Sequence, residues 1–127
     1  SVLQGERPVI RSDGTFVRDY IYVRDAALAY MTLADRMLER GLAGEAFNFS
    51  LEKPLSAREM VDLVLDRMGC MNLECEVLNQ GQNEIPIQML SANKACKVLG
   101  WRPRYDLETA LDETIDWYRS YFQEARK

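Results

Sequence analysis

Hydrophobic and polar positions alternate along residues 16–23, and this pattern predicts a strand that runs directly into a helix. Side chains on a strand alternate between faces, so Val17, Ile21 and Val23 share one face with Asp19. We expect Asp19 to be hydrogen-bonded, because an unpaired buried charge is very costly. The opposite face holds three aromatic rings and one guanidinium: Phe16, Arg18, Tyr20 and Tyr22.

This second face suits a flat, anionic ligand. Aromatic rings offer stacking surfaces, and the Arg18 guanidinium can donate two parallel hydrogen bonds to a phosphate. The alternative from spacing alone is an edge strand whose Arg18 pairs with a neighbouring carboxylate. Both interpretations stay open at this point.

The remaining pattern predicts four helices, each with an N-terminal polar residue. We expect the helix over 26–38, which has a wide apolar band, to be buried on more than one side. A capping box at Ser56 and Glu59 begins the helix over 57–68. The other predicted caps are Asp25, Ser91 and Asp106. On the last helix Leu111, Ile115, Tyr118 and Phe122 are spaced four, three and four apart, so they share one face.

Short strands are expected between these helices, over 8–11, 46–50 and 73–78, and residues 85–90 are expected to be extended. The order of strands and helices indicates a mixed α/β fold. Residues 1–5 resemble the last turn of a helix closed by glycine, so we expect the chain to start inside a helix. Trp101, Trp117 and the helical methionines, including Met31 and Met37, are expected in the core.

The composition of the chain excludes several classes of function. The 127 residues suffice for one domain, 1–127, and the net charge of −4 argues against a nucleic-acid partner. No apolar run is long enough to span a membrane. Histidine is absent and the three cysteines form no CxxC pair, which excludes a zinc finger and histidine-based catalysis within the chain. Three unpaired cysteines indicate reduced thiols and a cytoplasmic protein.

Motifs along the whole chain resemble the extended short-chain dehydrogenases, in particular the NAD-dependent nucleotide-sugar 4,6-dehydratases and epimerases. The motifs resemble CDP-glucose or GDP-mannose 4,6-dehydratases, and the choice among CDP, GDP, TDP and UDP stays open. Each motif alone is weak, but together they follow the family's order. The motifs lie at Pro8–Gly14, Val17–Asp25, Glu45–Ser50, Asn83–Pro86, Leu90–Ala95 and Leu99–Pro103.

The resemblance implies a C-terminal cap with the final strands of a Rossmann-type dehydrogenase. The cofactor-binding core is missing, because no GxGxxG turn and no Tyr-x-x-x-Lys occurs in the sequence. We therefore expect no catalytic, cofactor-binding or metal-binding residue in this chain. NAD is expected for the full-length family, whose dehydratases remove water from a hexose after transient oxidation at C4.

The resemblance also assigns substrate contacts. It implies that Arg18 binds the diphosphate of a nucleotide-diphosphate sugar and that Arg11 lies near the base. Many relatives have a second phosphate-binding arginine at the position of Gly81, so Gln82, Asn83 or Glu84 is expected to contribute instead. The predicted substrate-binding residues are Arg18, Arg11, Glu84 and Asn83.

Two functions follow. The first is the nucleotide-sugar-binding part of a dehydratase or 4-epimerase that is not catalytically complete alone. The second is a standalone, non-enzymatic binding or self-assembly module derived from a truncated dehydratase. In either case we expect a homo-oligomer. For the second function, the predicted contact surface is formed by the aromatic residues of the last helix, including Trp117 and Tyr121.

Overall fold

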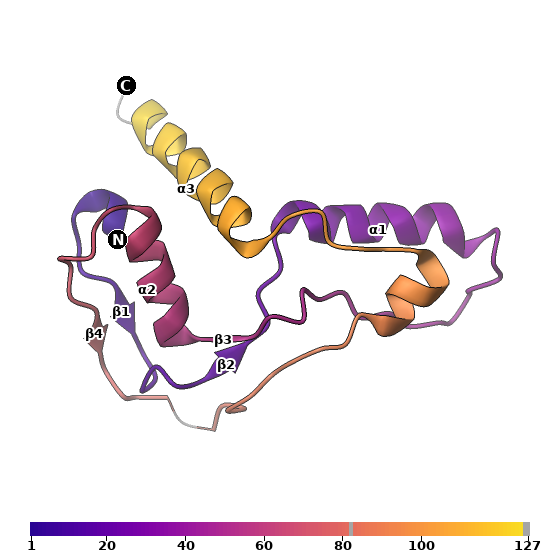
Figure 1. Ribbon diagram of the computed structural model, residues 1–127, viewed down its shortest axis with the longest axis horizontal. Coiled ribbons are helices and arrows are strands. Elements are labelled where there is room, and N and C mark those ends of the chain that lie inside the picture. Colours follow the sequence, from indigo (N-terminus) through magenta and orange to yellow (C-terminus); the bar gives the residue numbers. More distant parts are fainter. Residues whose placement is uncertain (82, 126–127) are drawn as a thin grey trace. The chain divides into compact units, whose positions relative to one another are not determined.

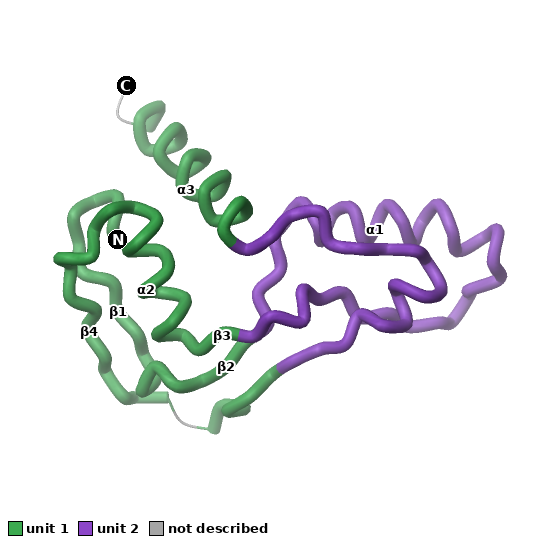
Figure 2. The backbone as a smooth tube through the Cα atoms, in the orientation of Figure 1, with its two compact units in different colours: residues 1–18, 55–88, 108–127 green, residues 19–54, 89–107 purple. Residues whose placement is uncertain are grey.

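The computed structural model describes residues 1–81 and 83–125, which form two compact units (Figures 1 and 2). Unit 1 comprises residues 1–18, 55–88 and 108–127, and unit 2 comprises residues 19–54 and 89–107. The elements in chain order are η1 (Val2–Gln4), β1 (Val9–Ile10), β2 (Val17–Arg18), α1 (Val23–Met37), β3 (Leu55–Ser56), α2 (Ala57–Arg67), β4 (Glu76–Val77), η2 (Ala95–Leu99) and α3 (Leu107–Glu124).

Two short strand pairs form the sheet structure of unit 1. β1 pairs in parallel with β4, and β2 pairs antiparallel with β3, with Arg18 opposite Leu55. A further parallel bridge joins Val17 to Ile87. The predicted strands are thus present at 8–11 and 73–78 but shorter than expected. Gly14 makes the turn between β1 and β2 with a φ of 90°, a conformation that favours glycine.

The helix α2 begins as its sequence predicts. The Ser56 side chain accepts a hydrogen bond from the Glu59 N–H, and the Glu59 carboxylate accepts one from the Ser56 N–H, which completes the capping box. Gly69 follows the end of the helix with a φ of 66°. The Arg67 guanidinium near this end forms ion pairs with Asp112 and Glu108 of α3.

The apolar face predicted for the last helix is confirmed. Its residues Leu111, Ile115, Tyr118 and Phe122 line one apolar hollow with Val64 and Met68 of α2 and the first residues of the chain. The first residues themselves form the helical turn η1, which Gly5 closes in the left-handed conformation. Unit 1 buries Ile10, Leu65, Ala110 and Ile115.

Unit 2 is organised around a small core. Its buried residues are Ala29, Ala92, Ala95, Leu99 and Trp101, and the predicted burial of Trp101 is confirmed. The Trp101 ring meets Phe49 edge to face at a centroid distance of 5.1 Å. Phe47 also packs against this core. Residues 46–50 nevertheless form no strand, because no described segment pairs with them.

Asp25 does not cap α1, so that prediction is wrong. The helix begins at Val23, and the N-cap position belongs to Tyr22, whose C=O accepts the Ala26 N–H. Asp25 is fully buried, and its carboxylate accepts the backbone N–H groups of Arg104 and Tyr105 at 2.9 and 3.2 Å. Because both carboxylate oxygens of Asp25 accept hydrogen bonds from this distant loop, the side chain does not cap the N–H groups at the start of its own helix.

Ser91 and Asp106 stand where the sequence places helix starts. Ser91 Oγ accepts the N–H of Asn93, the first helical residue before η2, and Gly100 ends η2 in the left-handed conformation. The helix α3 begins directly after Asp106. The Glu52 carboxylate adds a contact that the pattern did not predict, because it accepts both the Ser91 hydroxyl and the Ala92 N–H.

Several predicted core residues are exposed. Met31 and Trp117 are 62% and 59% exposed, and Val23, expected on a core face, is 70% exposed. The expectation that α1 is buried on more than one side is wrong for the described residues, because Tyr30, at 77%, is also open. No described helix is long and apolar enough to cross a membrane.

Candidate functional site

The site predicted from the sequence is centred on Arg18 of β2. Its Nη1 donates to the carbonyl oxygens of Val17 and Ile85 at 2.8 and 2.9 Å. Its Nη2 donates to Glu84 Oε2 at 3.1 Å, which is also an ion pair. The guanidinium lies 5.8 Å from the centroid of the Phe16 ring, within the range of a cation–π contact. Backbone, carboxylate and ring therefore fix one cation in one orientation.

The loop after β4, residues 78–88, is anchored at both ends, although Gln82 lies outside the described residues. At one end the Gln80 N–H donates to the Arg11 carbonyl at 2.7 Å. At the other end the Val17 N–H donates to Pro86, and the Gln88 N–H donates back to Val17. The loop thus places Glu84 and Ile85 beside Arg18.

Gly81 lies where this loop passes the turn between β1 and β2. A Cβ atom added there would be 3.0 Å from Ser12 Cβ, 3.2 Å from Ser12 Cα and 3.3 Å from the Phe16 ring. Contacts this short are tighter than most real Cβ contacts, and Ser12 is buried. A side chain at this position would therefore require Ser12 or the Phe16 ring to shift by a few tenths of an ångström.

The structure brings together two of the four predicted site residues, Arg18 and Glu84. Asn83 is exposed and adopts a left-handed backbone with a φ of 58° directly before Glu84. Arg11 is exposed after β1, and its carbonyl accepts the Gln80 N–H of the loop. Both belong to unit 1, as do Arg18 and Glu84.

The Ile85 carbonyl is a partner of Arg18 that the sequence did not predict. A backbone oxygen leaves no trace in the residue type, so no sequence pattern could have found it. Of the aromatic residues predicted to share a face with Arg18, Phe16 contacts its guanidinium. Tyr22 instead meets Tyr105 edge to face within unit 2, at a centroid distance of 4.9 Å.

Asp19, predicted to be hydrogen-bonded, is half-buried in unit 2. Its Oδ2 accepts the Ser50 hydroxyl, so the expectation is confirmed for that oxygen. Oδ1 is buried and has no partner among the residues that the structure describes. The hydrogen bond from Ser50 to Oδ2 thus joins the segment after β2 to the loop around Ser50.

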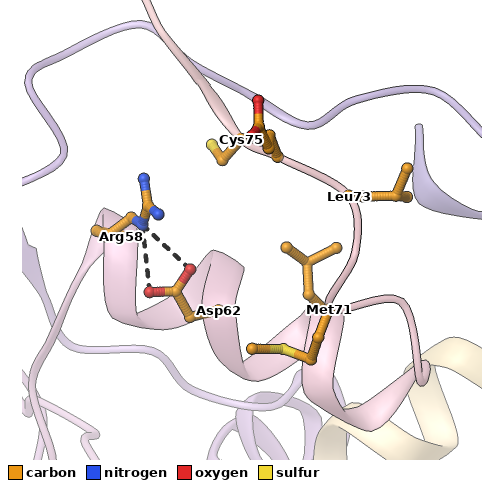
Figure 3. A pocket seen from close by; sticks show the side chains of 7 residues that line it. Arg58, Asp62, Met71, Leu73 and Cys75 are labelled. Atoms are coloured by element: carbon orange, nitrogen blue, oxygen red, sulfur yellow. Dashed lines mark hydrogen bonds and ion pairs between the residues drawn. The ribbon is translucent and has the colours of Figure 1, made fainter.

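A separate hollow of about 350 Å³ lies between α2 and the segment leading to β4 (Figure 3). Apolar side chains, including Leu65 and Met71, line it, and the Arg58 Nε at its edge donates to both oxygens of Asp62 at 3.1 and 3.2 Å. None of the predicted site residues lines this hollow. Within the described part of the chain, no group of acidic or sulfur side chains could hold a metal ion.

Known proteins resemble this chain over most of its length. Human dTDP-D-glucose 4,6-dehydratase is 30% identical over 96% of this chain and 35% of its own length. The UDP-glucose 4-epimerase of Halalkalibacterium halodurans is 28% identical over 86% of this chain and 32% of its own. No protein-family model matches the chain. The chain thus spans about a third of the length of the curated relatives it matches.

Solved structures that resemble this chain belong to the same kinds of enzyme as the sequence relatives. A UDP-glucose 4-epimerase from Thermotoga maritima, solved with UDP-glucose, superimposes with a TM-score of 0.81 at 26% identity, over 94% of this chain and 37% of that one. A dTDP-glucose 4,6-dehydratase from Bacillus anthracis, solved with NAD, gives 0.79 at 26% identity, over 94% and 36%. The chain is homologous to part of an extended short-chain dehydrogenase. The fold class and the resemblance to nucleotide-sugar epimerases and dehydratases are confirmed to that extent.

The described residues do not fit the NAD of the solved dehydratase. A dinucleotide pyrophosphate needs a glycine-rich turn between a strand and the helix that follows it. In this chain β2 leads to α1 through residues 19–22, and β3 leads directly into α2. Neither junction contains a glycine, so neither fits the pyrophosphate of NAD.

Proposed function

We propose that this chain is the nucleotide-sugar-binding part of an NAD-dependent nucleotide-sugar 4,6-dehydratase or 4-epimerase, and that it is not catalytically complete alone. The observation that supports the proposal is the fixed Arg18 guanidinium. Three of its N–H groups are engaged by Val17, Ile85 and Glu84, and the two that remain can donate to one phosphate. The relatives that act on UDP- and dTDP-linked sugars support the ligand class.

The other predicted residues complete the proposal. Asn83 is exposed in the loop that holds Glu84, and the exposed Arg11 is hydrogen-bonded to that loop through its carbonyl, so both are proposed to contact the nucleotide. NAD and the catalytic base would belong to other parts of a whole enzyme. The three cysteines, Cys70, Cys75 and Cys96, are unpaired, which supports a cytoplasmic location.

The test replaces Arg18 and measures binding of UDP, GDP, CDP and dTDP by calorimetry. We expect Arg18→Ala to lower the affinity about a hundredfold, because it removes a charge-assisted pair of hydrogen bonds. Arg18→Lys should restore only part of the affinity, since an ammonium lacks the planar fork. The melting temperature should change little, because the ion pair with Glu84 is partly exposed.

Arg7→Ala is the matched control, because Arg7 also pairs with a glutamate, Glu74, in unit 1. It should leave nucleotide affinity unchanged. Loss of folding in Arg18→Ala without any effect on binding in Arg18→Lys would instead identify Arg18 as a structural residue and contradict the proposal.

A second candidate function is a non-enzymatic module that self-assembles. The exposed aromatic residues of α3 favour it. Trp117 and Tyr121 are 59% and 52% exposed, and their rings stack at a centroid distance of 5.4 Å with an angle of 10°. Such a flat apolar surface is typical of a contact with another protein, and here we propose a second copy of this chain.

A further inference from the structure

We propose that unit 2 has an anion site of its own, a hollow between α1 and the loop over residues 100–104 that binds a phosphate group through Arg102 and Arg104. The ligand is a phosphate dianion, either free or as the monoester of a small organic group. The site uses none of the residues assigned above to nucleotide-sugar binding, which all belong to unit 1.

The hollow has a volume of about 260 Å³ and is lined by α1 and by the loop that follows η2 (Figure 1). Its apolar lining includes Leu28, and its polar side chains are Thr32, Trp101, Arg102 and Arg104. Among the described residues that line it, none is acidic. A water molecule occupies about 30 Å³ of liquid, so the hollow has room for a tetrahedral anion and part of an organic group. Two cations and a hydroxyl group around such a space favour an anionic ligand.

The two guanidiniums that line the hollow have no protein partner. Within the described residues, neither the Arg102 nor the Arg104 side chain makes a hydrogen bond or an ion pair. The contrast is with five other arginines that each bind a carboxylate or a carbonyl oxygen: Arg18, Arg40, Arg58, Arg67 and Arg119. Two cations on one hollow repel each other, and a dianion that accepts hydrogen bonds from both removes that repulsion.

The backbone of this loop is held in place at both ends. The Trp101 side chain is buried, and its backbone N–H donates to the Ala95 carbonyl at 3.3 Å. At the other end the backbone N–H of Arg104 donates to the buried Asp25 carboxylate at 2.9 Å. None of these contacts uses an arginine side chain, so replacement of either guanidinium leaves the loop anchored.

Pro103 orients the two arginines relative to each other. A residue before proline is biased toward an extended backbone, which applies here to Arg102. Side chains two residues apart in an extended segment lie on the same side, so Arg102 and Arg104 can line one hollow. A phosphate group can then accept charge-assisted hydrogen bonds from two guanidiniums at once.

The experiment titrates the protein with inorganic phosphate and with phenyl phosphate at constant ionic strength and follows the indole N–H signals by heteronuclear NMR. The chain has two tryptophans, of which Trp101 lines the hollow and Trp117 lies in unit 1. We expect the Trp101 signal to shift and to saturate while the Trp117 signal stays in place. Tighter binding of phenyl phosphate would identify a monoester as the ligand, and equal affinities would identify free phosphate as sufficient.

Arg102→Gln and Arg104→Gln should each weaken phosphate binding at least about tenfold, because each removes a charged pair of donors. The melting temperature should stay the same, because neither side chain has a partner in the described part of the chain. Lys53→Gln is the matched control, since it removes one positive charge from another exposed side chain of unit 2 and should leave the affinity unchanged.

Two further variants can overturn the inference. Lys97 lines a neighbouring hollow together with Arg102, so a loss in Lys97→Gln as large as that in Arg104→Gln would place the anion there instead. Loss of the titration in Arg18→Ala would place it in unit 1. Unchanged binding in Arg18→Ala is the expected result, and it keeps this inference separate from the proposed function.

The NMR signals supply the remaining outcomes against the inference. A Trp101 signal that phosphate does not shift would contradict binding in the hollow. An equal shift with sodium chloride at the same ionic strength would show that charge screening, and not a phosphate site, moves the signal.

Discussion

The Asp25 carboxylate is fully buried at the start of α1, where it accepts two backbone N–H groups from residues 104 and 105. Hydrogen bonds to a charged acceptor are stronger than neutral ones, and the first turn of a helix favours a negative charge. One side chain therefore joins two segments of unit 2 that lie far apart in the sequence. Sequence patterns assign such a residue to local capping, because they contain no information about the distant loop.

We predict that Asp25→Asn lowers the free energy of unfolding by about 1–3 kcal/mol, because an amide NH₂ would face a backbone N–H and leave it unsatisfied. Chemical denaturation measures the loss. Asp35→Asn is the control, since Asp35 is exposed on the same helix and should change stability little. Equal stability of the Asp25 and Asp35 variants would show that the buried contact is not a stabilising one.

At the scale of the element, α2 is defined by its capping box. The Glu59 carboxylate accepts the Ser56 N–H at 2.7 Å and the Ser56 hydroxyl at 2.7 Å, and these hydrogen bonds lower the pKa of Glu59 below its usual value. Because the pKa of Glu59 is lower in the folded than in the unfolded protein, these hydrogen bonds stabilise the fold fully at pH values above the unfolded-state pKa. The stabilisation is lost as the pH falls through the folded-state pKa. The beginning of α2 is therefore expected to weaken in acid.

We predict that Ser56→Ala lowers the free energy of unfolding by about 1 kcal/mol at neutral pH, as removal of an N-cap side chain does. The difference from wild type should shrink as the pH falls through the lowered pKa of Glu59, because the protonated carboxyl no longer accepts these hydrogen bonds as an anion. Denaturation at several pH values measures both effects. Ser120→Ala on the exposed face of α3 should show neither, and a difference that does not vary with pH would contradict the role of Glu59.

At the scale of the whole molecule, several large apolar side chains are exposed to solvent, and we expect a protein partner to cover some of them. The exposed large side chains include Tyr30 and Met31 on α1 and Trp117 and Tyr121 on α3. Scattered apolar residues on a surface are ordinary, but stacked aromatic rings along one helix are typical of an interaction site. For α3, we propose a second copy of the chain.

We predict that the wild-type protein sediments as a dimer or larger assembly and that Trp117→Glu shifts it to the monomer, because a charge on the stacked aromatic surface disfavours burial. Analytical ultracentrifugation over a range of concentrations measures the change. Gln123→Glu adds a charge to the same helix away from the Trp117–Tyr121 stack and should leave the assembly intact. Equal masses for wild type and Trp117→Glu would contradict the role of this surface.

Local chemistry in the sequence was enough to predict the capping box of α2 and the apolar face of α3. Each depends on residues within a few positions of one another. The ordered motifs were enough to predict the family resemblance. The tertiary structure decided the rest: that Asp25 caps a distant loop, that residues 46–50 find no strand partner, and that Ile85 and Glu84 hold Arg18. Those outcomes depend on contacts between segments far apart in the chain, which residue patterns do not encode.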